Sequence, residues 1–231
     1  MALADEIQAL KIHFLSDLVD AHDYYEDTKL AWTIVRNSIK TGSMFSNENA
    51  ITGTVTTQAD LLAKANDYVE KQLTQATFQQ FISIFESDLF DLLRHWLRAY
   101  PQNIMSRKVD IKTVLESPDK DAIILFAVNK ELNEVLYERP AGWFGYLEEK
   151  LKLGCPTADE IERIAEAKAS RDILVHNQGI AGKAYEFKAG KRARCKIGER
   201  IEIPEDYPHA TWELVRKVVT EISDGAIFKA S

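Results

Sequence analysis

Cysteine and proline are scarce in this 231-residue chain, which contains only two cysteines and six prolines. The two cysteines, Cys155 and Cys195, form no CxxC pair. The sequence therefore offers neither a disulfide framework nor a cysteine-based metal motif. A reducing compartment is the simplest setting for such a chain, and we expect a cytoplasmic protein.

Long apolar runs are also missing. The chain has no stretch of about 18 uncharged apolar residues, so we expect no transmembrane helix and no membrane partner. The first residues, Met1 to Glu6, lack the basic start and apolar core of a secretory signal peptide. The sequence contains no glycine-rich phosphate loop and no GxSxG motif. His13 and His22 have no acidic or cysteine partners at ligand spacing, so we expect neither a metal nor a cofactor.

The charge is mildly acidic overall but unevenly distributed. A net charge of −7 argues against a protein that coats nucleic acid nonspecifically. Residues 183–200, the basic segment, nevertheless contain seven basic residues against two acidic ones. Such a segment could steer a polyanion locally, or it could be an ordinary solvated loop. The residues of this segment that could contact a polyanion such as RNA are Lys183, Lys188, Lys191, Arg192 and Arg194.

Apolar residues recur at three- and four-residue spacing through the first hundred positions, which is typical of amphipathic helices. The pattern predicts a helix from Leu3 to just before Gly42, then a polar loop over residues 43–56. Thr57, with Asp60 three residues later, should open a helix that ends at Pro101, with a possible break near residues 74–77. The strongest apolar stripe of the chain is Phe78, Phe81, Ile82, Phe85, Leu89, Leu92, Leu93 and Trp96.

Helix signals continue in the second half of the chain. Ser117-Pro118 predicts a helix start, and the helix should run to about Tyr137. Residues 140–142 should end that helix, and a short helix should follow over residues 143–153. Thr157 with Glu160 forms a capping box, which predicts the start of another helix.

After Gly179 the periodicity changes. Alternation over residues 185–187, 196–198 and 200–204 predicts a small β-hairpin, and a last helix should cover residues 210–222. The fold class predicted is mostly α: a helical bundle with a small β-hairpin before the last helix. We expect residues 1–56 to form an N-terminal helical extension and residues 57–231 the main helical domain.

The segment whose side chains are best suited to catalysis lies at the end of the helix that begins after Thr157. It reads Arg171-Asp172-Ile173-Leu174-Val175-His176-Asn177-Gln178-Gly179. An arginine can hold a phosphate, and a histidine can move a proton near neutral pH. Asp172 and His176 are four residues apart and share one helix face, so the carboxylate could orient the imidazole.

Helix geometry separates Arg171 from His176 by about 140° around the axis. Either the last turn unwinds near Asn177–Gly179, or helices from two protomers share one site. The second possibility predicts a dimer. The plain alternative makes Arg171 a surface residue, His176 a favourable charge at the helix end, and Asn177 and Gly179 ordinary stop residues.

This segment resembles the R-[polar]-x3-H signature of the HEPN superfamily (higher eukaryotes and prokaryotes nucleotide-binding). The stretch Phe78-Gln79-Gln80-Phe81-Ile82-Ser83-Ile84-Phe85-Glu86-Ser87, which closes on Ala99-Tyr100-Pro101, resembles the first core helix of RiboL-PSP-type HEPN proteins. The short helix before the motif, and the hairpin and helix after it, fit the same layout. The resemblance covers roughly residues 57–225.

The resemblance implies a HEPN-like helical bundle that often forms homodimers through the motif helix and cleaves RNA without a metal. Roles of the family in toxin–antitoxin and other defence systems imply an antitoxin or similar partner. His176 would transfer protons, Arg171 would stabilise the phosphate, Asp172 would support the motif and Asn177 would shape the site. Glu86 is a weaker candidate, since an acid beside a core stripe is usually solvated. Some members have lost catalysis and bind RNA, nucleotide or a partner protein.

Overall fold

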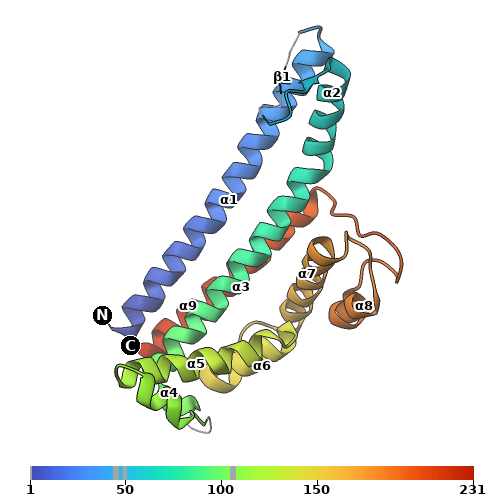
Figure 1. Cartoon of the computed structure of the whole chain (residues 1–231). Helices are drawn as coiled ribbons and strands as arrows, with labels where there is room; N and C mark the ends of the chain where they lie inside the picture. The colour runs from blue at the N-terminus through green and yellow to red at the C-terminus, as the bar shows by residue number, and fades with distance from the viewer. Residues whose placement is uncertain (1, 44–46, 49–50, 105–107) are drawn as a thin grey trace.

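The protein is a mostly α-helical bundle, as its apolar periodicity predicts (Figure 1). The computed structural model describes residues 2–43, 47–48, 51–104 and 108–231. The helices are α1 (Leu3–Lys40), α2 (Gln58–Asp67), α3 (Leu73–Ala99), α4 (Ile111–Glu116), α5 (Lys120–Leu136), α6 (Pro140–Leu151), α7 (Ala158–His176), α8 (Lys183–Ala189) and α9 (Asp206–Ala230). A π-helical turn, η1 (Tyr68–Gln72), joins α2 to α3, and single 3-10 turns cover Pro101–Ile104 and Gly190–Arg192.

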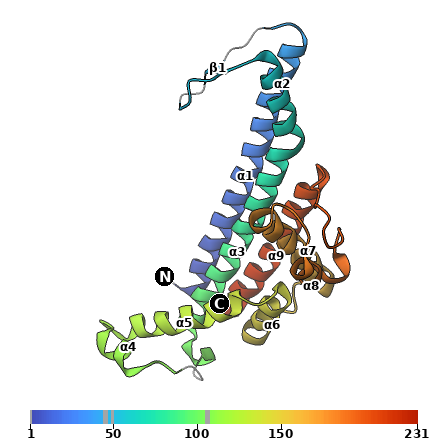
Figure 2. The same ribbon diagram turned by 45° about the vertical axis from the view of Figure 1, so that its right-hand side comes forward.

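Three long helices form the body of the bundle. Figures 1 and 2 show α1, α3 and α9 running side by side, with α4–α6 at one end and α7–α8 along one flank. All eight residues of the predicted apolar stripe on α3 are buried, which confirms α3 as the central core helix. Each such side chain contributes about 1.5–3 kcal/mol when it leaves water. The buried face of α1 consists of Ile7, Phe14, Leu18, Ala21 and Tyr25.

Residues of α1 therefore belong to the same core as residues of the later helices. Trp212 of α9 ties the two parts further, because its indole N–H donates to the Leu18 carbonyl oxygen at 3.2 Å. The proposed division of the chain at residue 56 stays a prediction. A short antiparallel pair, β1 (Asn47–Glu48) and β2 (Val55–Thr56), lies in the predicted loop, part of which falls outside the described residues.

Local capping signals fix several helix starts. The Thr57 hydroxyl accepts from the Asp60 backbone N–H at 3.2 Å, and Thr157 and Glu160 cap each other's backbone N–H groups. The predicted start at Ser117-Pro118 is wrong by two residues. Asp119 caps α5 instead, because its carboxylate accepts the Ala122 N–H at 2.8 Å.

Two other boundaries also differ from expectation. Pro140 begins α6 rather than breaking the chain before it, which is the position in a helix where proline costs least. The possible break at residues 74–77 is absent, and the irregularity is η1, a few residues earlier. Thr74 and Thr77 are buried within regular α3.

The predicted β-hairpin before the last helix is wrong. Residues 183–189 form α8, whose Tyr185 and Ala189, one helical turn apart, are buried. In this region the described backbone pairs only between residues 179–181 and 198–201, through an isolated bridge between Ile180 and Arg200 and flanking hydrogen bonds, and it forms no strand there. A short run with an aromatic at every second position is compatible with a strand or with a helix. Here the helix forms because it buries Tyr185 and Ala189, which are four residues apart, on one face. The last helix is also longer than predicted, running from Asp206 to Ala230.

Candidate functional site

The predicted motif lies at the end of α7, which stays regular through His176. Asn177 ends the helix: its backbone N–H donates to the Ile173 carbonyl at 3.0 Å, and its side-chain amide donates to the Ile180 carbonyl at 2.6 Å. Gln178 and Gly179 follow with φ values of 52° and 76°, in the left-handed region. The chain thus turns only after His176, so the turn does not bring His176 round toward Arg171.

Arg171 points into the molecule. Its side chain is 14% exposed, and one terminal nitrogen, Nη2, donates to the carboxylate of Glu86 on α3. The other terminal nitrogen, Nη1, lies 3.3 Å from Asp172 Oδ1. Its Nε is buried and has no hydrogen-bond acceptor in the described structure. Arg171 is therefore an anchored cation rather than a loose surface side chain.

Asp172 lies among cations instead of against the imidazole. Its carboxylate is 3.2 Å from Lys168 Nζ and 3.3 Å from Lys188 Nζ, in addition to Arg171. Within the described part of the chain, no hydrogen bond or ion pair joins Asp172 to His176. The expected Asp172–His176 contact is thus not formed, because three positive charges compete for the same carboxylate.

Glu86 is more central than the sequence suggests. Its side chain is only 16% exposed, and Lys168 Nζ lies 2.8 Å from its Oε1 while Arg171 holds its Oε2. Lys168 also sits 5.4 Å from the centre of the Trp143 ring. We name Glu86, Lys168, Arg171, Asp172 and Lys188 the Arg171 cluster. It joins α3, α7 and α8 with two acidic and three basic side chains.

His176 and Asn177 lie outside this cluster. Both are exposed, and the described residues provide no hydrogen bond, ion pair or ring contact to the His176 imidazole. The structure therefore separates the two main motif residues: Arg171 is anchored inward, and His176 faces solvent at the helix end. A ligand or another molecule can reach the imidazole without disturbing the fold.

Most of the basic segment is paired with acids of α7. Lys191 Nζ lies 2.8 Å from Glu162, and Arg194 Nε lies 2.8 Å from Glu166. Arg192 pairs with Asp159, and Lys188 pairs with Asp172. Among the five predicted RNA contacts, Lys183 alone has no ion pair within the described residues. A polyanion would have to compete with α7 for the other four.

Arg194 also belongs to a buried polar group that sequence reasoning missed. The Glu166 side chain, 6% exposed, accepts from Ser170 Oγ at 2.5 Å, from Arg194 Nε at 2.8 Å and from the Tyr207 hydroxyl. The Arg194 guanidinium lies 3.8 Å from the centre of the Tyr207 ring. Burial, followed by the nearby Glu166 charge, raises the pKa of Tyr207, so its hydroxyl stays protonated and donates. We name these four residues the Glu166 network.

A pocket of about 430 Å³ lies beside this network, between α7 and α9. Arg163, Lys191 and Arg192 line it together with Leu214 and Tyr207. Glu166 also lines the pocket, and Lys191 and Arg192 are paired with Glu162 and Asp159, so an anion in the pocket would compete with α7 for these cations. The pocket could not be found from sequence, because only the packing of α7, the turn after α8 and α9 brings its walls together.

The described residues contain no group of three or more histidine, cysteine, aspartate or glutamate side chains placed to hold a metal ion. Both cysteines are free thiols. No helix in the described ranges is long and apolar enough to cross a membrane. Comparison of the chain with models of protein families, with curated proteins and with solved structures found no match.

Proposed function

We propose that this protein is a metal-independent endoribonuclease of HEPN type, cytoplasmic, and active as a homodimer in which the ends of two α7 helices face each other. The observation that carries the proposal is the end of α7. An exposed imidazole, His176, follows an anchored arginine on one regular helix. Because one helix aims the two side chains about 140° apart, a second copy is needed to complete the site.

The chemistry follows from the two side chains. The RNA 2′-oxygen attacks the adjacent phosphorus, and the bond from phosphorus to the 5′-oxygen breaks, which leaves a 2′,3′-cyclic phosphate and a 5′-hydroxyl. His176 takes the 2′-hydroxyl proton and, as the imidazolium that results, gives a proton to the leaving 5′-oxygen, while the Arg171 beside it comes from the second copy. Arg171 stabilises the extra negative charge on phosphate, after one guanidinium N–H exchanges a Glu86 oxygen for a phosphate oxygen.

The test is RNA cleavage in EDTA, with the ends of the products identified. His176→Ala should lower the cleavage rate by a factor of about 10² or more without affecting folding, since His176 is exposed. Arg171→Lys keeps the charge but loses the planar fork, and it should lower the rate as well. His13→Ala, also an exposed histidine, is the matched control. Cleavage that survives in both motif variants contradicts the proposal.

The shared site has a separate test. When the His176→Ala and Arg171→Lys proteins are mixed and allowed to exchange subunits, half of the dimers are mixed. If Arg171 and His176 of one site come from different copies, each mixed dimer holds one intact site. The mixture should then regain about a quarter of the wild-type rate. No recovery in a protein shown to exchange subunits would place both residues of a site on one copy.

A second candidate is a binding module for RNA, nucleotide or a partner protein that performs no cleavage. It is favoured by Asp172, whose carboxylate contacts three cations instead of orienting His176. The cationic pocket between α7 and α9 could then hold the ligand's phosphate. Binding of RNA without cleavage across a broad substrate panel would favour this candidate.

A role in a toxin–antitoxin or anti-phage defence system belongs to the same proposal. Expression of the wild type should arrest growth, while His176→Ala should not. A second chain that co-purifies with the wild type would identify the antitoxin or other partner. Unchanged growth with an active ribonuclease would remove the toxin role and leave the catalytic proposal standing.

A further inference from the structure

The groove between α1 and α3 contains a buried carboxyl group without a partner. Asp88 of α3 is 8% exposed, and its carboxyl makes no hydrogen bond or ion pair within the described residues. It lines a pocket of about 330 Å³. An ionised carboxylate that is largely removed from water and has no partner is disfavoured, although the Asp88 oxygens are not fully buried and can be reached from the pocket.

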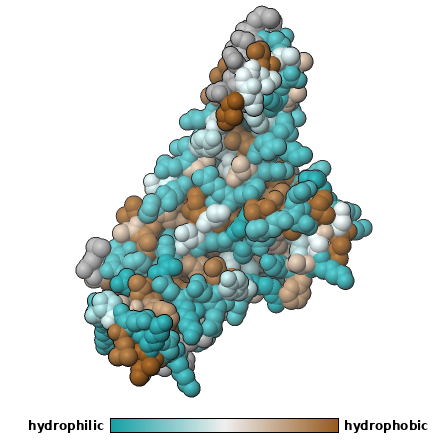
Figure 3. All heavy atoms as spheres, viewed as in Figure 1, coloured by the Kyte–Doolittle hydropathy of each residue, from teal (hydrophilic) through white to brown (hydrophobic). Residues whose placement is uncertain are grey.

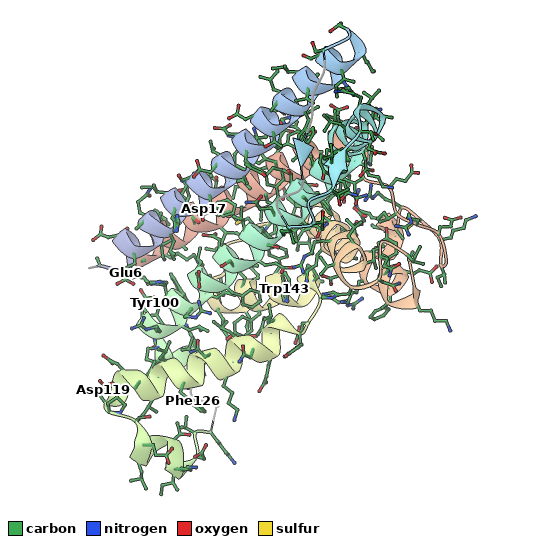
Figure 4. All side chains as sticks on the ribbon, turned by 45° about the horizontal axis from the view of Figure 1, so that its top comes forward. Glu6, Asp17, Tyr100, Asp119, Phe126 and Trp143 are labelled. Atoms are coloured by element: carbon green, nitrogen blue, oxygen red, sulfur yellow. The ribbon has the colours of Figure 1, made fainter. Side chains whose placement is uncertain are left out.

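The charged groups around Asp88 do not supply the missing partner. Asp17 of α1 (labelled in Figure 4) and Asp91 of α3 line the same pocket. Two basic side chains in this region face the other acids, since His13 Nδ1 lies 3.3 Å from Asp17 and Arg94 pairs with Asp91. Burial, then the charges of Asp91 and Asp17, raise the pKa of Asp88 to about 7. The residues that line the groove therefore include three carboxyl groups and one histidine.

The walls of the groove indicate which kind of cation fits. Leu10 and Phe14 of α1 and Ile84 of α3 line the pocket beside the acids. The described acidic and histidine side chains are not placed to hold a metal ion. An ammonium or guanidinium group on an apolar stem matches both kinds of wall, because its charge can meet Asp88 while its methylene groups cover Leu10 or Ile84.

We propose that this groove, the Asp88 groove, binds an organic cation, a primary ammonium or guanidinium on a short apolar stem, with Asp88 as its main counter-ion. The cation can come from a free polyamine or from a lysine or arginine side chain of a docked peptide, which share this chemistry. The proposal does not depend on ribonuclease activity, because the groove lies between α1 and α3 and includes no residue of the α7 motif. Figure 3 shows a mostly hydrophilic surface, with hydrophobic patches among it, on the face of the molecule turned to the viewer.

The experiment titrates the full chain with two probes at constant ionic strength. Putrescine represents the free polyamine, and N-acetyl-lysine methylamide represents the peptide side chain. The readout is the ¹³C resonance of the Asp88 carboxyl. A bound cation should lower its pH midpoint by about one unit, which corresponds to tenfold tighter binding to the ionised form.

Three substitutions test the assignment. Asp88→Asn keeps the shape of the side chain and should weaken binding at least about tenfold, while Asp91→Asn should weaken it less because Asp91 is partly exposed. Asp20→Asn, on the exposed face of α1, is the matched control and should leave binding unchanged. Binding of one probe but not the other identifies the source of the cation. No saturable binding of either probe, or equal binding by Asp88→Asn, would overturn the proposal.

Discussion

Removing the carboxylate of Glu166 should destabilise the protein far more than removing any exposed acid of the same helix. Glu166→Ala leaves the partly buried Tyr207 hydroxyl without its acceptor. It also removes the charge that Arg194 Nε contacts at 2.8 Å and the oxygen that Ser170 contacts at 2.5 Å. These three losses occur together at one buried point between α7, α9 and the segment that follows α8.

Breaking a buried ion pair typically costs about 3–5 kcal/mol. The lower end applies here, because the Arg194 side chain is 25% exposed and can recover water when its partner is lost. We therefore expect the free energy of unfolding to fall by about 3 kcal/mol. With a urea m-value of about 2.5 kcal/mol per M for a chain of this size, the midpoint should fall by roughly 1 M.

Urea unfolding followed by the helical circular dichroism signal measures this change. Glu162→Ala is the matched control, since Glu162 lies one turn earlier on α7 and pairs with Lys191 near the surface. Its midpoint should remain close to that of the wild type. Should Glu166→Ala shift the midpoint no more than Glu162→Ala does, the Glu166 network would not stabilise the fold, and our account of Arg194 would fail.

Two further predictions concern pH. Because the pKa of Asp88 is raised to about 7, the stability that protonated Asp88 contributes is complete below pH ~4 and is lost as the pH rises through about 7. Over that interval the free energy of unfolding of the wild type, measured with urea, should fall by about 4 kcal/mol relative to that of Asp88→Asn. Parallel pH curves for the two proteins would refute this. The hydrogen bond from Lys217, aided by Thr157, lowers the pKa of Glu160 to about 2, so the stability that ionised Glu160 contributes is present above pH ~4 and is lost as the pH falls toward 2. Lys217→Met should therefore be less stable than the wild type at pH 7 but not at pH 2. An NMR titration of the variant should show a higher pKa for Glu160.

Local signals predicted the parts of this fold that local physics determines. Thr157 and Glu160 predict the start of α7, because each side chain accepts a hydrogen bond from the backbone N–H of the other residue. The apolar stripe of α3 is equally local, since its spacing alone assigns it to one helix face. The hairpin prediction failed because Tyr185 and Ala189 gain more from burial against the bundle than a two-stranded ribbon would provide.

The candidate site was only partly predictable for a related reason. The sequence identified Arg171 and His176, but the partner of Arg171, Glu86, comes from a helix 85 residues earlier. An acid next to a core stripe looks solvated until the opposite helix is known. Asp172 shows the same limit, because its i, i+4 spacing to His176 allowed a contact that Lys168 and Lys188 prevent.

The position of α9 has a consequence for how the chain is made. This helix, the last along the sequence, packs against both α1, the first, and α3 (Figure 1). A ribosome that adds about 5–20 residues per second needs roughly ten to thirty seconds to pass from the end of α1 to the start of α9. Throughout that delay, the apolar side chains of α1 that face α9 lack their final cover. The cover of α1 is therefore completed in two stages, first by α3 and only much later by α9.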